Sequence, residues 1–215
     1  MRRIAMVTQK GGAGKSTLAI CLGVAAREAG ESVALVDLDP MGSLTGWGNR
    51  RNGGDIMVMA ASPGELSEIM GQLEALGVTL AIIDTPAGDS ALAEEAIAEA
   101  QLCLVPARPN IFDVAASQGT LQKLKHRDYS FVLNQCPPQR QAPRIQQGIN
   151  ALADMGVLLT PLVAARADYQ EAARRGLGVT EFAASGAAAA EMRELWRSTR
   201  DRLDGVAEHR KSDAA

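Results

Sequence analysis

The segment Lys10-Gly11-Gly12-Ala13-Gly14-Lys15-Ser16-Thr17 decides the fold of this chain. It lies between an apolar run that predicts a strand, Ile4–Thr8, and a pattern that predicts a helix, Lys15–Ala29. A glycine-rich connection in this context is typical of a phosphate-binding loop, because successive backbone N–H groups and the helix N-terminus together attract an anion. We expect Lys15 to neutralise the β- and γ-phosphates of a nucleotide and Ser16 to bind Mg²⁺. A glycine-rich turn without a ligand is the alternative.

The start of this loop departs from the usual pattern. The strict pattern, G-x-x-x-x-G-K-[ST], requires a glycine where this chain has Gln9. A second lysine, Lys10, precedes the glycine pair and places another cation beside Lys15. A dinucleotide fingerprint, G-x-G-x-x-G, fails because it requires a glycine at Thr17. The sequence therefore predicts a variant phosphate loop with more positive charge than one lysine supplies.

Short apolar runs alternate with Ala-, Leu- and Glu-rich stretches, which is typical of a parallel sheet covered by helices. We expect an α/β fold with a doubly wound, mostly parallel sheet. Besides Ile4–Thr8, the predicted strands are Val33–Asp37, Ile56–Ala60, Leu80–Asp84, Leu102–Pro106, Phe131–Asn134 and Val157–Val163. Besides Lys15–Ala29, the predicted helices are Gly64–Leu76, Ser90–Ala100, Ala115–Lys125, Arg144–Met155 and Ala188–Leu203. The 215 residues fit one domain, residues 1–204, and we expect the polar tail, residues 205–215, to be frayed.

Two of the predicted strands end in carboxylates. Asp37 and Asp39 are two residues apart, so their side chains point to one face, and Asp84 closes another apolar run. Open α/β sheets bind ligands at the carboxyl ends of their strands. There, one carboxylate can hold metal-bound water while another orients or deprotonates the attacking water. The alternative for Asp37 and Asp39 is that they cap the helix that follows them.

Composition argues against several other classes of protein. The apolar fraction of 47% permits a full core, and the net charge of −3 does not indicate a nucleic-acid binder by bulk electrostatics. Only 3% of the residues are aromatic, which argues against base stacking. Cys21, Cys103 and Cys136 lack a paired spacing, so we expect buried thiols rather than zinc ligands or disulfides. The sequence contains no membrane-spanning run, and residues 208–215 lack the bulky apolar face of a membrane-binding helix.

Taken together, the variant loop, Asp37-Leu38-Asp39-Pro40 and Asp84-Thr85-Pro86 resemble the deviant Walker ATPases of the ParA/MinD superfamily. Three further segments look like the small ParA partition ATPases: Ser43–Trp47, Pro106–Pro109 with the nearby Asp113, and Arg166–Phe182. Those ATPases lack an N-terminal DNA-reading domain, and we expect none here because the first predicted strand begins at Ile4. One departure is Met41, where the family usually has Gln.

The resemblance implies an ATPase of the deviant P-loop type that uses ATP and Mg²⁺ and forms an ATP-dependent homodimer. In that dimer, Lys10 of each subunit reaches the phosphates that the other subunit holds. Catalysis is thereby assigned to Lys10, Lys15 and Asp39, with Asp39 positioning the attacking water. The implied nucleotide-binding residues are Gly11, Gly12, Ala13, Gly14, Lys15, Ser16 and Thr17, with Asn134, Pro106 and Pro109 around the adenine. The implied metal-side residues are Ser16, Asp37 and Asp84.

The resemblance also implies that the ATP-bound dimer binds double-stranded DNA without reading its sequence, in a bacterial cytoplasm and at the nucleoid. A ParB-like or cargo adaptor protein would stimulate hydrolysis and release the DNA, moving a plasmid or a protein cluster. The candidate DNA-contacting residues are Arg193, Arg197 and Arg200, which share one face of a predicted helix, together with Arg166, Arg174 and Arg175. The alternative is an ordinary salt-bridged surface, because four acidic residues lie on the same helix: Glu191, Glu194, Asp201 and Asp204.

Two other functions remain open from the sequence. An ATP-dependent enzyme of cofactor biosynthesis can use the same loop, but it needs further polar groups for its substrate, and the sequence shows no obvious set. An iron–sulfur ATPase of the nitrogenase-reductase type needs cysteines on loops near a dimer axis, whereas Cys103 lies within an apolar strand run.

Overall fold

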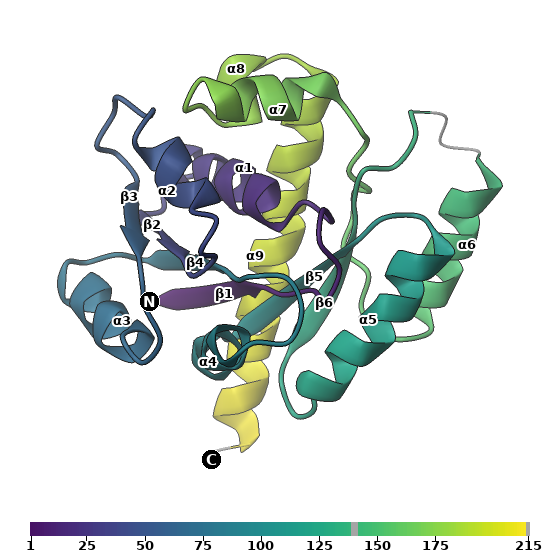
Figure 1. The fold of residues 1–215 in the computed structure, drawn as a ribbon, viewed down its shortest axis with the longest axis horizontal. Helices are drawn as coiled ribbons and strands as arrows, with labels where there is room; N and C mark the ends of the chain where they lie inside the picture. The colour runs from purple at the N-terminus through teal and green to yellow at the C-terminus, as the bar shows by residue number, and fades with distance from the viewer. Residues whose placement is uncertain (139–141, 214–215) are drawn as a thin grey trace.

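A six-stranded parallel sheet forms the centre of the molecule (Figure 1). The computed structural model describes residues 1–138 and 142–213, except for the side chains of residues 207–213. The strands are β1 (Arg2–Met6), β2 (Val33–Asp37), β3 (Met57–Ala60), β4 (Leu80–Asp84), β5 (Leu102–Ala107) and β6 (Tyr129–Leu133). Their order is β3-β2-β4-β1-β5-β6, and every pairing between them is parallel. The carboxyl ends of β1, β2 and β4 therefore meet at one edge of the sheet.

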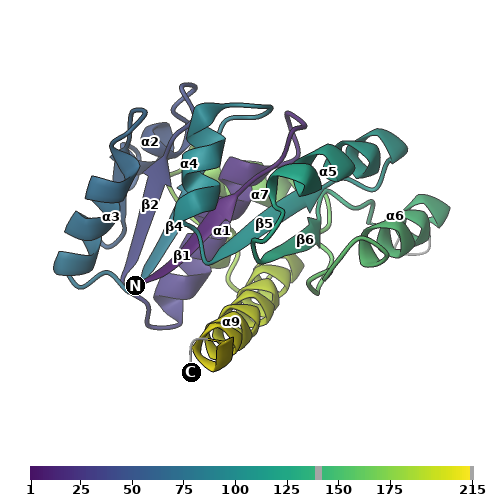
Figure 2. The same cartoon turned by 90° about the horizontal axis from the view of Figure 1, so that it is seen from below.

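Helices cover both faces of the sheet, which explains why the strand sequences are continuously apolar (Figure 2). The helices are α1 (Lys15–Glu28), α2 (Ser43–Gly48), α3 (Leu66–Ala75), α4 (Ala91–Glu99), α5 (Ile111–Lys123), α6 (Pro143–Ala153), α7 (Ala167–Arg174), α8 (Val179–Phe182) and α9 (Ala187–Asp213). Alternate residues of β1 point to opposite faces, so Ile4 and Met6 pack against α1 and α9 while Ala5 packs on the side of α3 and α4. None of the described helices has the length and apolar character needed to cross a membrane.

The expected α/β class is confirmed, but the seventh predicted strand, Val157–Val163, is wrong. In the described structure, residues 157–164 run beside β6 and the residues after it, and they make isolated bridges: Phe131 with Leu158 and Cys136 with Ala164. The amide of Leu159 donates to the Phe131 carbonyl and the amide of Val163 donates to the Leu133 carbonyl. Pro161 lies between these two hydrogen bonds and has no N–H to donate, so a continuous ladder does not form.

The helices differ from the sequence-based expectation in their number and in the length of α9. Helices α2, α7 and α8 were not predicted, because they have eight residues or fewer and α2 contains two glycines. Helix α9 continues to Asp213, past the boundary at residue 204 where we expected a frayed tail to begin. The reason lies in Val206, which is buried three residues after the buried Leu203 and so extends the apolar face of the helix. Residues 214–215 lie outside the described residues.

The turn between α7 and α8 docks onto the end of α2. The indole N–H of Trp47 donates to the Leu177 carbonyl at 3.2 Å, and the Arg51 guanidinium donates to the Gly176 carbonyl at the same distance. Arg51 also makes two hydrogen bonds to Glu181 and lies over the Trp47 ring. These contacts join a segment that follows β2 to one that lies some 130 residues later in the chain.

Replacing Gly176 by alanine tests this docking. Gly176 has a φ of +72°, and a Cβ atom there would lie 2.5 Å from the Arg50 carbonyl oxygen. We expect Gly176→Ala to lower the free energy of unfolding by roughly 1–3 kcal/mol, measured by urea denaturation. Gly71→Ala in α3 is the matched control, since nothing lies within 4 Å of its Cβ position and helical glycine favours replacement. Equal stability of the two variants would contradict the docking.

Candidate functional site

Two side chains directly after β6 form hydrogen bonds to the backbone of the phosphate loop. The Asn134 amide donates to the Ala13 carbonyl at 2.8 Å, and the Gln135 amide donates to the Gly12 carbonyl at 2.9 Å. Gly14 starts α1 with a φ of +93°, and a Cβ atom there would lie 2.4 Å from the Asn134 amide nitrogen. Because the loop carbonyls point backwards to these amides, the loop can present its N–H groups to an anion.

Lys15 is a buried cation at the first position of α1. The residue is 7% exposed, and its ammonium makes no hydrogen bond or ion pair with any residue that the structure describes. Burial lowers the pKa of Lys15, while the negative charges of Asp84 and Asp39 act in the opposite direction. A buried ammonium group without a hydrogen-bonded partner is unfavourable, so this position favours an anionic ligand.

Asp84 faces Lys15 and Ser16 from the end of β4. The Ser16 hydroxyl donates to Asp84 Oδ2 at 2.5 Å, whereas the buried Oδ1 atom has no hydrogen-bond partner among the described residues. Burial raises the pKa of Asp84 to about 7, although the Ser16 hydrogen bond and the charge of Lys15 both lower it.

These groups fit Mg²⁺. An unpartnered carboxylate oxygen beside a hydroxyl can hold the ion directly or through a water molecule, so Ser16 and Asp84 would hold the metal. The described residues contain no cluster of three or more His, Cys, Asp or Glu side chains that could bind a metal alone. Mg²⁺ is commonly bound by one or two carboxylates together with phosphates and water, which matches this sparse set.

Asp37 and Asp39 separate into two roles. Asp37 is buried, and its carboxylate accepts hydrogen bonds from the backbone N–H of Asp39 and from both the N–H and the hydroxyl of Thr45. Asp37 is expected on the metal side, and in the structure both of its oxygens accept hydrogen bonds within the turn that leads into α2. Asp39 is partly exposed at that turn and lines the same cavity as Lys15 and Ser16. Its carboxylate accepts one hydrogen bond, from the Met41 N–H.

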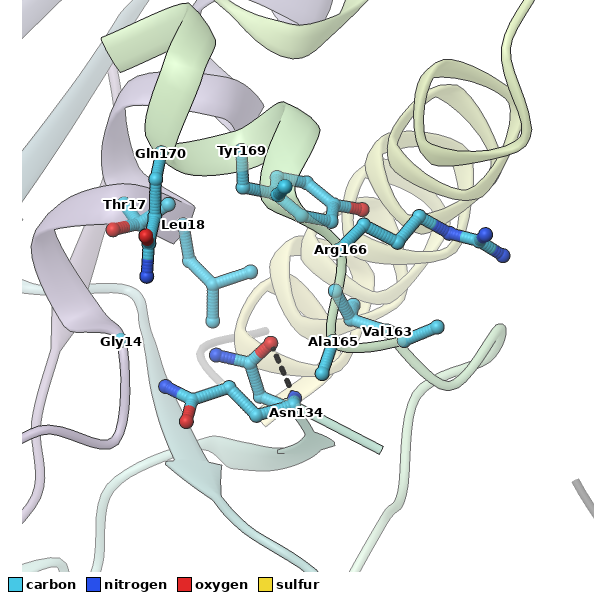
Figure 3. A pocket seen from close by; sticks show the side chains of 12 residues that line it. Gly14, Thr17, Leu18, Asn134, Val163, Ala165, Arg166, Tyr169 and Gln170 are labelled. Carbon is cyan, nitrogen blue, oxygen red and sulfur yellow. Dashed lines mark hydrogen bonds between the residues drawn. The ribbon is translucent and has the colours of Figure 1, made fainter. Parts of the chain in front are cut away.

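Two adjoining cavities lie beside the loop. The first, which we call the base pocket, has a volume of ≈ 390 Å³ (Figure 3). The second, the phosphate cavity, has a volume of ≈ 630 Å³ and lies over the loop itself. Both are lined by Gly14, Thr17 and Gln170, so one elongated ligand can extend from one cavity into the other. Gln170 points from α7 toward Thr17, whereas Arg166 points away toward α9 (Figure 3).

The expected base-binding residues are only partly brought together. Asn134 lines the base pocket, as does Tyr169. Pro106 and Pro109 do not line it, which corrects their expected place around the adenine. Pro106 is buried within β5 opposite Val132 of β6, and Pro109 lines a different cavity between α5 and α6.

The six candidate DNA-contacting arginines form three groups. Arg193, Arg197 and Arg200 line one shallow pocket between α9 and α1, and each lies within 4.0 Å of a carboxylate. Arg174 and Arg175 share Glu171 on α7. Arg166 is paired with the buried Glu191 and lies apart from the α9 group. The structure therefore brings together the α9 arginines but neutralises each locally.

Several residues of the site were not found from the sequence. Gln135 supports the loop, Gln170 and Tyr169 line the base pocket, and Thr45 holds Asp37. Gln135 directly follows Asn134 at a strand end, and this position is the one signal that could have indicated it. The others lie on α2 and α7, two short helices whose place at the site depends on tertiary packing.

The comparison with known proteins agrees with the site described above. Residues 4–179 match the family model described as "CobQ/CobB/MinD/ParA nucleotide binding domain". The chain belongs to this family. The "Maintenance of carboxysome distribution protein A" of Halothiobacillus neapolitanus is 27% identical over 87% of this chain and 91% of its own length. The "Chromosome-partitioning ATPase Soj" of Thermus thermophilus is 31% identical over 58% of this chain and 62% of its own length.

Solved structures show the same fold. MinD of Aquifex aeolicus superposes with a TM-score of 0.79 at 16% identity, over 94% of this chain and 98% of that one. MinD of Pyrococcus horikoshii, solved with Mg-ADP, gives a TM-score of 0.72 at 20% identity, over 95% and 98%. The expected relationship to the ParA/MinD ATPases is thus confirmed, and the chain is an ATPase of this family.

The arrangement can support hydrolysis of a phosphoanhydride. The loop N–H groups and Lys15 balance phosphate charge, and Mg²⁺ held at Ser16 and Asp84 would add a further positive charge. Asp39 lines the same cavity as the loop and can orient a water molecule there. Asp37 fixes the backbone of Asp39 through a hydrogen bond of 3.2 Å.

The ionisation of Asp84 predicts a pH-dependent stability. Its pKa is about 7 in the folded chain against an ordinary value of 3.8, so the folded state binds the proton more tightly. The ligand-free protein should therefore lose stability as pH rises from about 4 to about 7. We expect Asp84→Asn to remove this loss and to be more stable than the original chain at pH 8, by on the order of 2–4 kcal/mol.

Urea denaturation at pH 5 and pH 8 measures this difference. Asp154→Asn is the matched control, because Asp154 is exposed at the end of α6 and should leave the pH dependence unchanged. The same loss of stability between the two pH values in Asp84→Asn as in the original chain would contradict the assignment.

Proposed function

We propose that this chain is an ATP-dependent dimerisation switch that positions or segregates a cargo on non-specific double-stranded DNA. Two ATP molecules with Mg²⁺ would lie between the subunits, and a ParB-like or cargo adaptor protein would stimulate hydrolysis. The observation that carries the proposal is that two lysines of one loop lie in different environments. Lys15 is buried in the loop, whereas Lys10 is exposed at its tip and makes no ion pair with any described residue.

An exposed lysine at the loop tip fits a contact to a second subunit. The Lys10 backbone N–H donates to the Thr8 hydroxyl, but no contact of its ammonium with the described chain holds it in place. The site already has Lys15 inside, so Lys10 can neutralise phosphate charge in a neighbouring site. The names of the relatives support a positioning or partition role, since one concerns carboxysome distribution and another chromosome partitioning.

A second function is favoured by the family description alone. The matching model also includes CobQ and CobB, so an ATP-dependent enzyme acting on a small molecule is the alternative. Phosphate release that a small molecule stimulates, with no effect of DNA, would favour that alternative.

Binding of DNA would use the arginines of α9. Arg193, Arg197 and Arg200 lie on one surface, and the carboxylate partners of Arg197 and Arg200 are largely exposed. Exposed ion pairs contribute only about 0–1 kcal/mol, so DNA phosphates can replace the carboxylates. Dimerisation would double the number of arginines, and each neutralised phosphate would increase the salt dependence of binding. Association with the nucleoid would follow from this contact.

Lys10→Ala tests the switch. We expect this variant to bind ATP within one subunit but to remain a monomer, because the contact to the partner's phosphates is lost. Mass measurement by light scattering after size exclusion, with Mg-ATP and in an Asp39→Ala background that slows hydrolysis, reports the dimer. Lys125→Ala removes an exposed lysine beyond α5 and should leave the dimer intact. A Lys10→Ala dimer with ATP would refute the proposal.

Arg197→Ala/Arg200→Ala tests the DNA contact. We expect duplex binding to require ATP, to ignore base sequence, and to weaken about tenfold or more in this variant at low salt. The plot of log affinity against log salt should also become less steep. Lys125→Ala/Arg144→Ala removes the same charge from other exposed positions and is the control. Fluorescence anisotropy of a labelled duplex measures the affinity and its salt dependence. Equal losses of affinity in the two double variants would argue against the α9 surface.

A further inference from the structure

Two arginines outside the loop also line the phosphate cavity. Arg50 follows α2 and Arg174 ends α7, and both line this cavity together with Lys15 and Asp39. We propose that Arg50, assisted by Arg174, contacts the terminal phosphate of ATP bound in the same subunit. This inference rests on the proposed use of the loop for ATP, and it adds a residue that the sequence motifs did not indicate.

The position of Arg50 within the cavity indicates which phosphate it meets. A nucleotide passes from the base pocket to the phosphate cavity at Gly14 and Thr17, which line both. Asp39 and Arg50 line the phosphate cavity but not the base pocket. The phosphate most distant from the base therefore lies nearest to these two residues.

Arg50 is available for an anion. Its guanidinium donates to the Gly46 carbonyl and forms no ion pair with a carboxylate in the part of the chain that the structure describes. Arg174, in contrast, is held by Glu171 at 2.7 Å and 3.0 Å. Both Arg174 and Glu171 are substantially exposed, so that pair is weak and a phosphate can replace it. Arg50 is therefore the primary contact and Arg174 the secondary one.

Where α7 and α8 dock onto α2, adjacent arginines make different contacts. Arg51, next to Arg50, is nearly buried and binds Glu181 and Asp55 through both oxygens of each carboxylate. Arg175, next to Arg174, lies over the Phe182 ring at 5.0 Å. Arg50 and Arg174 line the phosphate cavity, whereas Arg51 and Arg175 do not.

The chemistry of these groups fits a terminal phosphate group. A guanidinium offers parallel N–H donors that match two oxygens of a phosphate group, and it is always charged. Among the described residues that line the cavity, Asp39 is the one carboxylate, against the three cations Lys15, Arg50 and Arg174. This excess of positive charge at the end of the cavity distinguishes a triphosphate from a diphosphate.

Titration calorimetry with Mg²⁺ and either a non-hydrolysable ATP analogue or ADP tests the inference. All variants are made in the Lys10→Ala background, so that binding is measured within one subunit. We expect Arg50→Gln to weaken binding of the ATP analogue about tenfold or more and binding of ADP by less than about twofold. Arg174→Gln should change affinity in the same direction by a smaller factor, and Arg50→Lys should restore part of the affinity.

Arg175→Gln is the matched control, because it removes the same charge from the neighbouring residue that does not line the cavity. Unfolding in urea checks that Arg50→Gln remains folded, which its exposed side chain favours. Unchanged affinity for the ATP analogue, or equal losses for the analogue and ADP, would overturn the assignment of Arg50.

A further comparison separates this inference from the proposed function. Lys15→Ala should bind neither nucleotide. If the parent chain binds neither, the proposed function itself fails. If the parent binds both and Lys15→Ala binds neither, while Arg50→Gln keeps the parent affinities, then only the role of Arg50 is refuted.

Discussion

The buried charges at the carboxyl edge of the sheet are the constraint on which the rest of the site depends. Lys15 and Asp84 are both buried, and burial lowers the pKa of Lys15 and raises the pKa of Asp84, which in each case favours the neutral form. Their mutual attraction only partly opposes this, and one oxygen of Asp84 remains without a donor in the described structure. Such an arrangement is unfavourable in the empty protein and becomes favourable when phosphate and metal supply the missing charges.

Residues outside the loop that carries Lys15 hold its backbone in place. Amides of Asn134 and Gln135 bind its carbonyl groups, and the absence of a side chain at Gly14 lets Asn134 approach. The end of β6 thus determines how the loop following β1 presents its N–H groups. One element consequently supports the phosphates and lines the base pocket at the same time.

A second connection joins the acidic turn to the distant helices. Asp37 binds Thr45 at the start of α2, and Trp47 and Arg51 bind the turn between α7 and α8. The same helices place Gln170 and Arg174 at the cavities. Packed side chains therefore connect the turn that holds Asp39 to the turn that follows α7.

Local sequence was sufficient for the parts of the site that depend on local geometry. The run from strand to glycines to helix fixed the loop, and apolar runs that end in Asp37 and Asp84 located the carboxyl ends of β2 and β4. Local sequence did not reveal that Asp37 binds its own turn, because that depends on Thr45 eight residues later. The family resemblance implied that Pro106 and Pro109 lie near the base, whereas Pro106 pairs with Val132 inside the sheet and Pro109 lines another cavity.

The sequence by itself determined the α/β class, the phosphate loop and the acids at the strand ends, because each follows from periodicity and spacing within a few residues. Only the tertiary structure decided which side chains surround the ligand. Helix α2 is short and contains two glycines, α7 is also short, and both pack against α1. Arg50, Gln170 and Arg174 reach the cavities by that packing, and contacts between residues so far apart in the chain leave no local pattern to read.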